Sequence, residues 1–153
     1  MDLIKKACFY ARKRYQKNDH KHQCSHVENV LKRALEIAKN FKNVDYEALE
    51  LAIIFHDIDY SSYETHVEES MKVAEEFLKK NNYPKDRIEK VKEIMLNHSG
   101  PHRSKLGNAT LLEGKIIYDA DKSIFINTIE LYEKYYPRLY LDVTKKMVKK
   151  PLC

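Results

Sequence analysis

The sequence predicts an all-α protein, a bundle of about six to seven helices, and three observations indicate this. Only three glycines and four prolines interrupt the chain of 153 residues. Between these breaks, apolar residues recur at the spacing of a buried helix face. The apolar run LAIIF would suit a strand by itself, but the stretch EALELA that leads into it favours a helix.

The first half of the chain is expected to contain four helices. The first covers about residues 3–16, and the second begins near Ser25 with its apolar residues on one stripe. Asp45 has the side chain of a typical N-cap and would open the third helix, which ends at the apolar run. The fourth covers residues 66–80 (HVEESMKVAEEFLKK).

The second half is expected to contain the remaining helices and one long loop. A fifth helix begins after Pro84 and ends near His98. Residues 99–108 (SGPHRSKLGN) are expected to form a loop, because glycine, proline and small polar residues gather there. A long sixth helix covers about residues 111–135, and Pro137 opens a last short one, since proline is favoured in a first turn.

Composition predicts a cytoplasmic protein that does not enter membranes. No apolar run reaches the roughly 20 residues of a membrane span, and the N-terminal residues lack the pattern of a secretory signal. The three cysteines are odd in number and widely spaced, which fits reduced thiols better than a disulfide framework. No repeat or linker divides the chain, so residues 1–153 are expected to form a single domain.

The charged residues give a net charge of +5, but basic and acidic residues alternate over most of the chain. This mixing is typical of solvated helix faces. Two stretches are more one-sided, KKACFYARKRYQK and TKKMVKK. Either could contact nucleic acid or an anionic substrate, but a solvated basic helix is the favoured interpretation of both. Without a helix-turn-helix pattern, an aromatic platform or a dense basic face, the sequence argues against a nucleic-acid binder.

Several polar residues fall on apolar helix faces, where each needs a partner. His26 lies on the inward face of the second helix, and His98 continues the apolar stripe of the fifth. His56 and Asp57 close the most apolar helix in the chain. Each alone has an ordinary explanation, such as a hydrogen-bonded core histidine or a capping carboxylate. One divalent cation would satisfy all of them at once. A shared metal site and the ordinary explanations are therefore equally favoured.

Asp119 and Asp121 are two further carboxylates, on the expected sixth helix. They cannot easily face one centre together, because two residues turn about 200° around a helix. Apolar residues lie on both sides of this helix, so burial alone does not choose between them. Histidine nitrogens combined with carboxylate oxygens suit Mn²⁺, Mg²⁺, Fe²⁺, Ni²⁺ or Zn²⁺ better than a thiolate site would.

Three segments resemble the HD-domain superfamily of metal-dependent phosphohydrolases, whose ligands follow the order His, His-Asp and a distant Asp. HKHQCSHVENVLKRALEIA is similar to the family's first histidine helix, and LAIIFHDIDY to its apolar run followed by His-Asp. GKIIYDADKS is similar to its DAD segment, in which the second aspartate is the ligand. The resemblance covers roughly residues 20–130, with the three segments in the family's order.

The resemblance implies an HD-like fold and one divalent metal ion that activates water for attack on a phosphomonoester or phosphodiester. The four ligands that it implies are His26, His56, Asp57 and Asp121. The substrate is expected to be a small-molecule phosphate ester, with nucleotides as the first class. A homodimer is left open.

Five further residues receive roles by their nearness to these ligands. Lys122 would stabilise charge on the phosphoryl group, and Asp59 would orient the water or protonate the leaving oxygen. His66, His98 and Arg103 are expected to contact substrate. A solvated carboxylate explains Asp59 equally well, and a solvated loop residue explains Arg103.

Three positions depart from the family pattern. Asn29 stands where members often carry arginine, Asp59 where glycine is common, and Ser123 where an apolar residue usually follows the DAD segment. None of the three removes an implied ligand, but Asn29 and Ser123 alter the expected surroundings of the substrate.

Two alternatives remain beside the hydrolase. Some HD proteins carry two additional histidines and bind a second metal. His66 comes only nine residues after Asp57, sooner than in most such binuclear sites, which favours substrate-facing roles for His66 and His98. If both bound a second iron, a di-iron oxygenase would follow. The other alternative is a non-catalytic HD module that binds a metal or a nucleotide.

Overall fold

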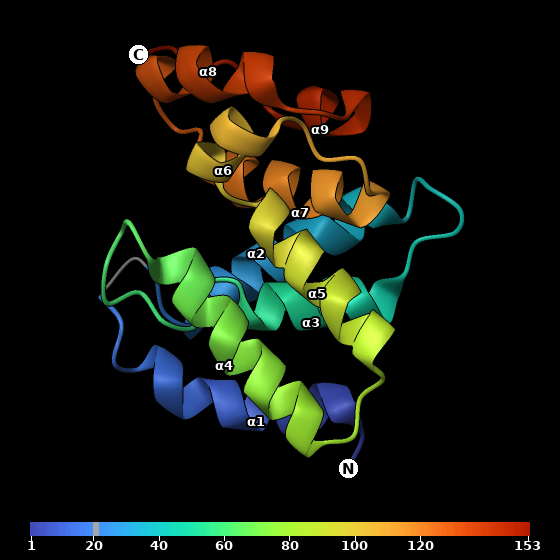
Figure 1. Cartoon of the computed structure of the whole chain (residues 1–153). Helices are drawn as coiled ribbons and strands as arrows, with labels where there is room; N and C mark the ends of the chain where they lie inside the picture. The colour runs from blue at the N-terminus through green and yellow to red at the C-terminus, as the bar shows by residue number, and fades with distance from the viewer. Residues whose placement is uncertain (20–21) are drawn as a thin grey trace.

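The computed structural model describes residues 1–19 and 22–153 and shows an all-α fold (Figure 1). The first two residues of the HD-like stretch, 20 and 21, lie outside the described residues. The described part of the chain contains nine α-helices and one short 3₁₀ helix: α1 (Leu3–Tyr15), α2 (Cys24–Ala38), α3 (Tyr46–Phe55), α4 (His66–Lys80), α5 (Lys85–Asn97), α6 (Gly100–Leu106), α7 (Leu112–Ser123), α8 (Ile129–Tyr135), η1 (Tyr136–Arg138) and α9 (Asp142–Met147).

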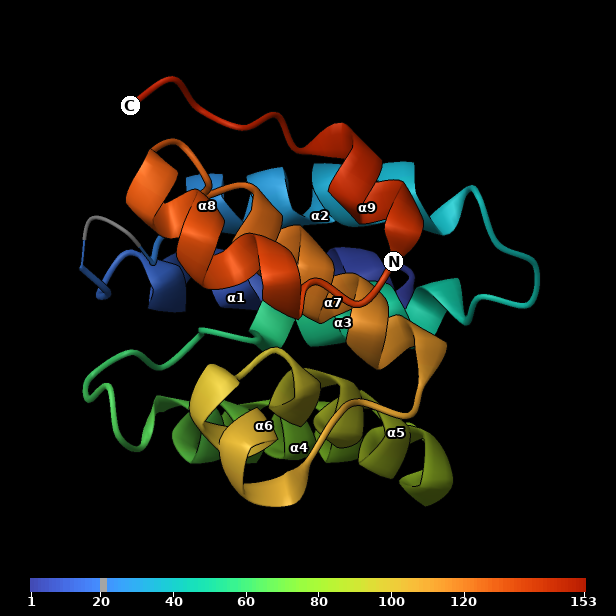
Figure 2. The same ribbon diagram turned by 90° about the horizontal axis from the view of Figure 1, so that it is seen from above.

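Helix α3 is the centre of the fold, because apolar side chains surround it on every side. Seven of its ten residues are buried, and it packs against α1, α2, α4, α5 and α7. Each fully buried leucine, isoleucine or phenylalanine in such a helix contributes about 1.5–3 kcal/mol to stability. Figure 1 shows α1 at one end of the molecule and α8 with α9 at the other, and Figure 2 gives the view from above.

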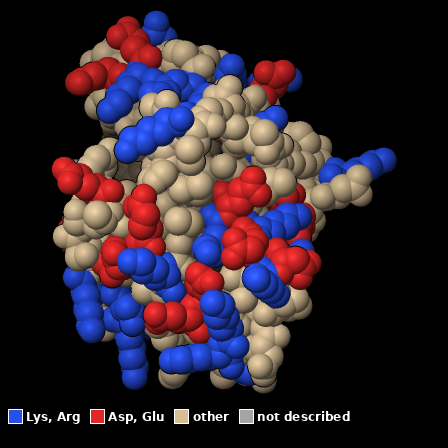
Figure 3. All heavy atoms as spheres, in the orientation of Figure 1, with Lys and Arg blue, Asp and Glu red and all other residues tan. Residues whose placement is uncertain are grey.

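The all-α fold class is confirmed, and the helix positions expected in the first half of the chain agree closely with the structure. Asp45 is the N-cap of α3, and its carboxylate accepts a hydrogen bond from the Ala48 amide. On the face shown in Figure 3, lysines and arginines are interspersed with aspartates and glutamates. No helix among the described residues is long and apolar enough to cross a membrane.

The segment expected as a loop at residues 99–108 contains helix α6, so that expectation was wrong. The Ser99 side chain accepts from the His102 amide, and Pro101 lies in the first turn. Both features are helix-start signals. Gly107, with a φ of 90°, ends the helix in a conformation that glycine adopts without strain.

The long helix expected over residues 111–135 is broken in two, which raises the helix number above the expected one. Helix α7 ends at Ser123, and Thr128 starts α8 because its side chain accepts from the Leu131 amide. Pro137 lies in the 3₁₀ turn η1 and not at the start of the last helix, which is α9.

Candidate metal centre

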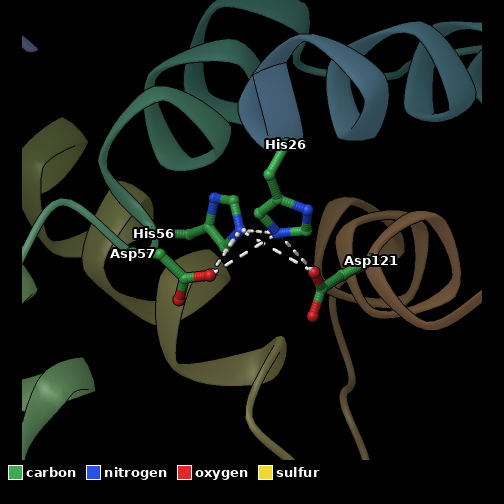
Figure 4. Close-up of side chains that lie close together, drawn as sticks. All are labelled: His26, His56, Asp57 and Asp121. Atoms are coloured by element: carbon green, nitrogen blue, oxygen red, sulfur yellow. Dashed lines mark hydrogen bonds and ion pairs between the residues drawn. The ribbon is translucent and has the colours of Figure 1, made fainter. Parts of the chain in front are cut away.

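Four of the residues implied as ligands converge at one buried point (Figure 4). His26 comes from α2, His56 and Asp57 directly follow α3, and Asp121 comes from α7. One ligand atom from each lies within 4.8 Å of the others. The structure thus brings together the residues that the sequence singles out, and their role as ligands stays a prediction.

The distances within this group are those of donors around a common centre. His26 Nε2 lies 3.1 Å from Asp121 Oδ1 and 3.5 Å from Asp57 Oδ2. His56 Nε2 lies 3.2 Å from Asp57 Oδ2 and 3.8 Å from Asp121 Oδ1. The side chains of all four residues are buried.

The two imidazoles face each other with the same nitrogen, so a proton or a metal ion must lie between them. His56 Nδ1 lies 2.6 Å from the Ile53 carbonyl oxygen and donates to it, so Nε2 of the neutral ring carries a lone pair. That nitrogen lies 3.3 Å from His26 Nε2. A lone pair on each nitrogen would repel the other, so a proton or a metal ion must lie within the group.

The electrostatics of the group agree with this requirement. Burial acts to lower the pKa of His56, but the carboxylates of Asp57 and Asp121 outweigh it and raise this pKa to about 10. Burial acts to raise the pKa of each carboxyl, and neighbouring cationic groups instead hold both pKa values well below their ordinary range. Two buried carboxylates therefore attract positive charge to this point.

A second group of donors shares Asp57 with the first. Asp57 Oδ1 lies 3.3 Å from His98 Nε2 and 3.6 Å from His66 Nε2. This oxygen is buried without a hydrogen-bond partner in the described structure. His66 Nδ1 lies 2.7 Å from the Tyr63 carbonyl oxygen, and His98 Nδ1 also bonds a carbonyl oxygen, that of Met95. Both rings therefore turn Nε2 toward Asp57, as histidines that ligate metals do.

Although His66 follows Asp57 by only nine residues, its side chain reaches the second donor group. His66 is the first residue of α4, and the connection from Asp57 folds back so that the start of α4 returns to the end of α3. Asp57 thus presents Oδ2 to one pair of histidines and Oδ1 to another. The donor set fits a divalent cation at each of the two groups.

Two residues near the end of the first helix hold the backbone of the His-Asp segment, and sequence reasoning missed both. The buried Tyr15 hydroxyl donates to the Ile54 carbonyl oxygen at 2.7 Å. Asn18 Nδ2 donates to the Asp57 carbonyl oxygen, also at 2.7 Å. Both contacts span about forty residues of sequence, so no local pattern announces them.

A pocket of about 520 Å³ opens onto both donor groups. Lys122 lines it, and its ammonium lies 2.9 Å from Asp121 Oδ2. His22 stacks on Tyr60 with ring centroids 3.5 Å apart. The aromatic residues that line the pocket are Tyr60, Tyr63, Phe125 and Tyr135.

The structure does not bring Asp59 and Arg103 to the lining of this pocket. Asp59 Oδ1 accepts from the Ser61 amide at 3.3 Å and the Ser61 hydroxyl at 2.8 Å. The Arg103 guanidinium lies 4.0 Å from the centroid of the Tyr140 ring and donates to the Arg138 carbonyl oxygen at 2.6 Å. These contacts give Arg103 a structural role, in holding the segment that follows α8.

Asp119 points away from the centre, as the helical geometry of α7 requires. Its two carboxylate oxygens accept from the backbone amides of Tyr140 at 2.8 Å and Leu141 at 2.9 Å. Asp121 is therefore the aspartate of this helix that enters the cluster.

Comparison with known proteins agrees with this arrangement. Residues 24–124 match the HD domain family. The chain is similar to the crystal structure of a predicted HD superfamily hydrolase from an uncultured Thermotogales bacterium, with a TM-score of 0.71 at 23% identity over 94% of this chain and 81% of that one. It is also similar to a Listeria innocua protein, with a TM-score of 0.65 at 20% identity over 96% of this chain and 87% of that one.

A third similar structure is that of a Lactobacillus plantarum protein, with a TM-score of 0.69 at 18% identity. The match covers 88% of this chain and 63% of that longer one. No curated protein matches the chain. At these identities the solved structures show the shared fold, whereas the family match extends over more than half of the sequence. The chain therefore belongs to the HD domain family.

Proposed function

We propose that this protein is a metal-dependent phosphohydrolase that cleaves a phosphate ester of a small molecule. The observation that carries the proposal is the arrangement around Asp57, in which each carboxylate oxygen faces a different pair of histidine nitrogens. The similar Thermotogales protein, described as a predicted HD superfamily hydrolase, supports the same class of reaction.

The proposed metal ligands fall into two sets that share one carboxylate. His26, His56, Asp57 and Asp121 would hold one divalent ion, and Asp57 with His66 and His98 would hold a second. The sequence favoured a single ion, and the position of both additional histidines against Asp57 Oδ1 is our reason to propose two. A divalent ion in such a site lowers the pKa of bound water and polarises a phosphoryl oxygen.

Lys122 is the residue proposed to stabilise the charge on the phosphoryl oxygens. Its ammonium lies at the edge of the donor groups and lines the pocket. Burial acts to lower the pKa of Lys122, but Asp121 outweighs it and raises this pKa, so the side chain stays protonated. A fixed cation beside the reacting phosphate stabilises developing negative charge. The proposal does not use Asp59 or Arg103, because neither lines the pocket.

The pocket supports nucleotides as the first substrate class. Its volume of about 520 Å³ falls within the range of small-molecule sites. Tyr63 lines the pocket with an exposed ring, and a planar base would stack on such a ring.

A di-iron oxygenase is the second candidate, and the sharing of Asp57 between two donor groups favours it as well. The two reactions differ in what they consume. A hydrolase releases phosphate with or without oxygen, whereas an oxygenase turns over only when oxygen is supplied.

The test is a hydrolysis screen of the protein loaded with Mn²⁺ and, in parallel, with Fe²⁺, in air and under nitrogen. The substrates are p-nitrophenyl phosphate, bis(p-nitrophenyl) phosphate and nucleotides, and the readout is release of p-nitrophenol or phosphate. We expect equal release under both atmospheres and loss of release in Asp121→Asn. Asp119→Asn is the matched control, since it changes a buried aspartate of the same helix outside the cluster. A protein that binds metal and hydrolyses none of these esters would overturn the proposal, and oxygen-dependent turnover would replace it with the oxygenase.

A further inference from the structure

A second cavity adjoins the pocket and runs along α2. This α2 groove has a volume of about 470 Å³. Its lining consists of Ser25, His26, Asn29, Lys32, Arg33 and Glu36 from α2, with Ile124 and Phe125 from the segment after α7. The groove and the pocket share His26 and Phe125, whose rings stack with centroids 5.2 Å apart. A ligand that occupied both would therefore pass this pair of rings.

The α2 groove contains two cations that no carboxylate neutralises. Within the residues that the structure describes, neither Lys32 nor Arg33 has a carboxylate within ion-pairing distance, whereas Lys122 in the pocket is paired with Asp121. One Arg33 nitrogen, Nη1, donates to the Ser123 hydroxyl at 3.0 Å, which fixes the partly buried guanidinium in place. Its remaining N–H groups are available to bind an anion in the groove.

Two residues that depart from the family pattern meet at this groove. Asn29 lines it with a short neutral side chain, which leaves space beside Lys32 and Arg33. Ser123 supplies the hydroxyl that holds Arg33. Glu36 is the one carboxylate of the lining, and it would oppose binding of an anion.

The distance along α2 sets the kind of ligand that would use both cavities. Arg33 follows His26 by seven residues, which is about 10 Å along a helix axis. A single phosphate at the metal centre does not span this distance. A molecule that reached from the centre into the groove would carry a second anionic group, separate from the phosphate at the centre.

We propose that the α2 groove binds a second anionic group of the substrate, so that the preferred substrate is an extended phosphate ester with two separated anionic groups. This inference rests on the proposed function, because the first phosphate is placed at the metal centre. An oligophosphate chain and an ester with phosphates at both ends share this chemistry. Arg33 is the main anion-binding residue, since its planar guanidinium binds phosphate through two N–H groups, and Lys32 adds charge.

The test uses alkane bisphosphonates of increasing chain length as non-hydrolysable rulers, with alkyl monophosphonates of the same lengths as references. Affinity of the Mn²⁺-loaded protein for each is measured by isothermal titration calorimetry. We expect bisphosphonates to bind about tenfold more tightly than monophosphonates once the chain spans the two cavities, a difference of about 1.4 kcal/mol. Bisphosphonates too short to reach the groove can still chelate Mn²⁺ at the centre, so the advantage is counted as the part that Arg33→Gln removes, and for short chains this part is expected to be absent.

Four variants assign the advantage to the groove. Arg33→Gln is expected to remove most of the affinity advantage. Lys32→Gln is expected to lower the advantage by a smaller factor, and because Lys32 is exposed, its replacement should not disturb the fold. Glu36→Gln is expected to increase the advantage, because the one opposing charge of the lining is removed. Lys39→Gln is the matched control: it removes a positive charge at the end of the same helix, outside the groove, and should leave the advantage unchanged.

The outcomes separate this inference from the proposed function. Equal affinity for mono- and bisphosphonates at every length, or an equal loss in Arg33→Gln and Lys39→Gln, would overturn the groove and leave the hydrolase intact. A length-dependent advantage that depends on Arg33, in a protein that hydrolyses no phosphate ester, would support the groove as an anion site and overturn the proposed function alone.

Discussion

Asp57 connects the two donor groups, because each of its oxygens faces a different pair of histidines. Its backbone is fixed by Asn18, which donates to its carbonyl oxygen, and by Tyr15, whose hydroxyl accepts from its amide. A buried carboxylate oxygen without a hydrogen-bond partner is costly unless a cation compensates it. The chemistry of the whole centre therefore depends on this one side chain.

Replacement of Lys122 by glutamine separates catalysis from metal binding. The variant keeps all proposed ligands but removes the cation beside Asp121. We expect kcat for phosphate release to fall by about 100-fold or more, as when one charge-stabilising group is lost from a preorganised site. Metal content, measured by elemental analysis, should stay at the wild-type level. Loss of bound metal together with activity would contradict the role given to Lys122.

Asp119→Asn should affect stability and leave the centre alone. The wild-type carboxylate accepts from two backbone amides that hold the segment before α9 against α7. An asparagine oxygen replaces only one of these acceptors, so we expect a loss of about 1–3 kcal/mol in the free energy of unfolding by urea. Phosphate release from the folded variant should match wild type, and a variant without activity would place Asp119 in the site.

At the scale of single residues, apolar surroundings singled out His26, His56 and Asp57, and the HD resemblance chose Asp121 over Asp119. Sequence did not place Arg103, whose position depends on Tyr140 and Arg138 far along the chain. For His66, counting residues from Asp57 says nothing about the direction in which the connection folds. A local pattern shows which face of a helix a residue occupies, but not which distant segment will meet it.

At the scale of elements, the contact between α5 and α7 depends on Gly114. A methyl group at this position would lie 1.9 Å from Asn97 Oδ1 and 2.7 Å from Asn97 Cγ, so the whole Asn97 side chain would have to move. We expect Gly114→Ala to lower the free energy of unfolding by about 1–3 kcal/mol, although alanine is the better helix former. In the double variant Gly114→Ala with Asn97→Ala, the free energy of unfolding, measured in urea, should regain most of this loss. If the losses of the two single variants simply add in the double variant, the clash is contradicted.

The start of α3 is held to α5 by charge, which gives the fold a pH-dependent contribution to stability. Arg87 binds the Asp45 carboxylate through two nitrogens, one of them at 2.9 Å, and Lys90 Nζ lies 3.0 Å from Asp45 Oδ2. The hydrogen bond from Arg87 is the main reason that the pKa of Asp45 lies below its ordinary value. Because this pKa is lowered by folding, the stabilisation is present above the unfolded pKa near 3.8 and is lost as pH falls toward the folded pKa.

Asp45→Asn tests this contribution while it keeps a good N-cap. We expect the variant to be less stable than wild type by about 1–2 kcal/mol in urea unfolding at pH 7, after allowance for solvent around the pair. The difference should shrink when unfolding is measured at pH 3, because Asp45 of the unfolded chain then takes up a proton while its folded pKa stays lower. A difference that does not change between the two pH values would show that charge is not the cause.

Helix boundaries were predictable where caps and periodicity agreed, as for Asp45 at the start of α3. They failed where a short helix begins among turn-forming residues. The Ser99 and Pro101 signals were outweighed by the nearby glycines, so α6 was missed. The break between α7 and α8 was missed because apolar periodicity continues across it, and the Thr128 cap, visible only as a side-chain to backbone bond, decides it.

At the scale of the whole molecule, the donors come from helices that lie far apart in sequence and meet only when the bundle closes. The donors of the first group come from α2, from the end of α3 and from α7. The start of α4 and the end of α5 add the two histidines of the second group. Metal binding therefore requires the folded state, and a ligand that binds only the folded state stabilises it. The metal-loaded protein is thus expected to be more resistant to unfolding than the metal-free one.

The measurement that tests the central claim most directly is metal bound per chain, by elemental analysis after equilibration with Mn²⁺ and removal of free metal. The account predicts two ions per chain in wild type, loss of both in Asp57→Asn, and two in Asp119→Asn. Wild-type protein that retains no metal, or Asp57→Asn protein that retains as much as Asp119→Asn, would contradict a metal centre organised around Asp57.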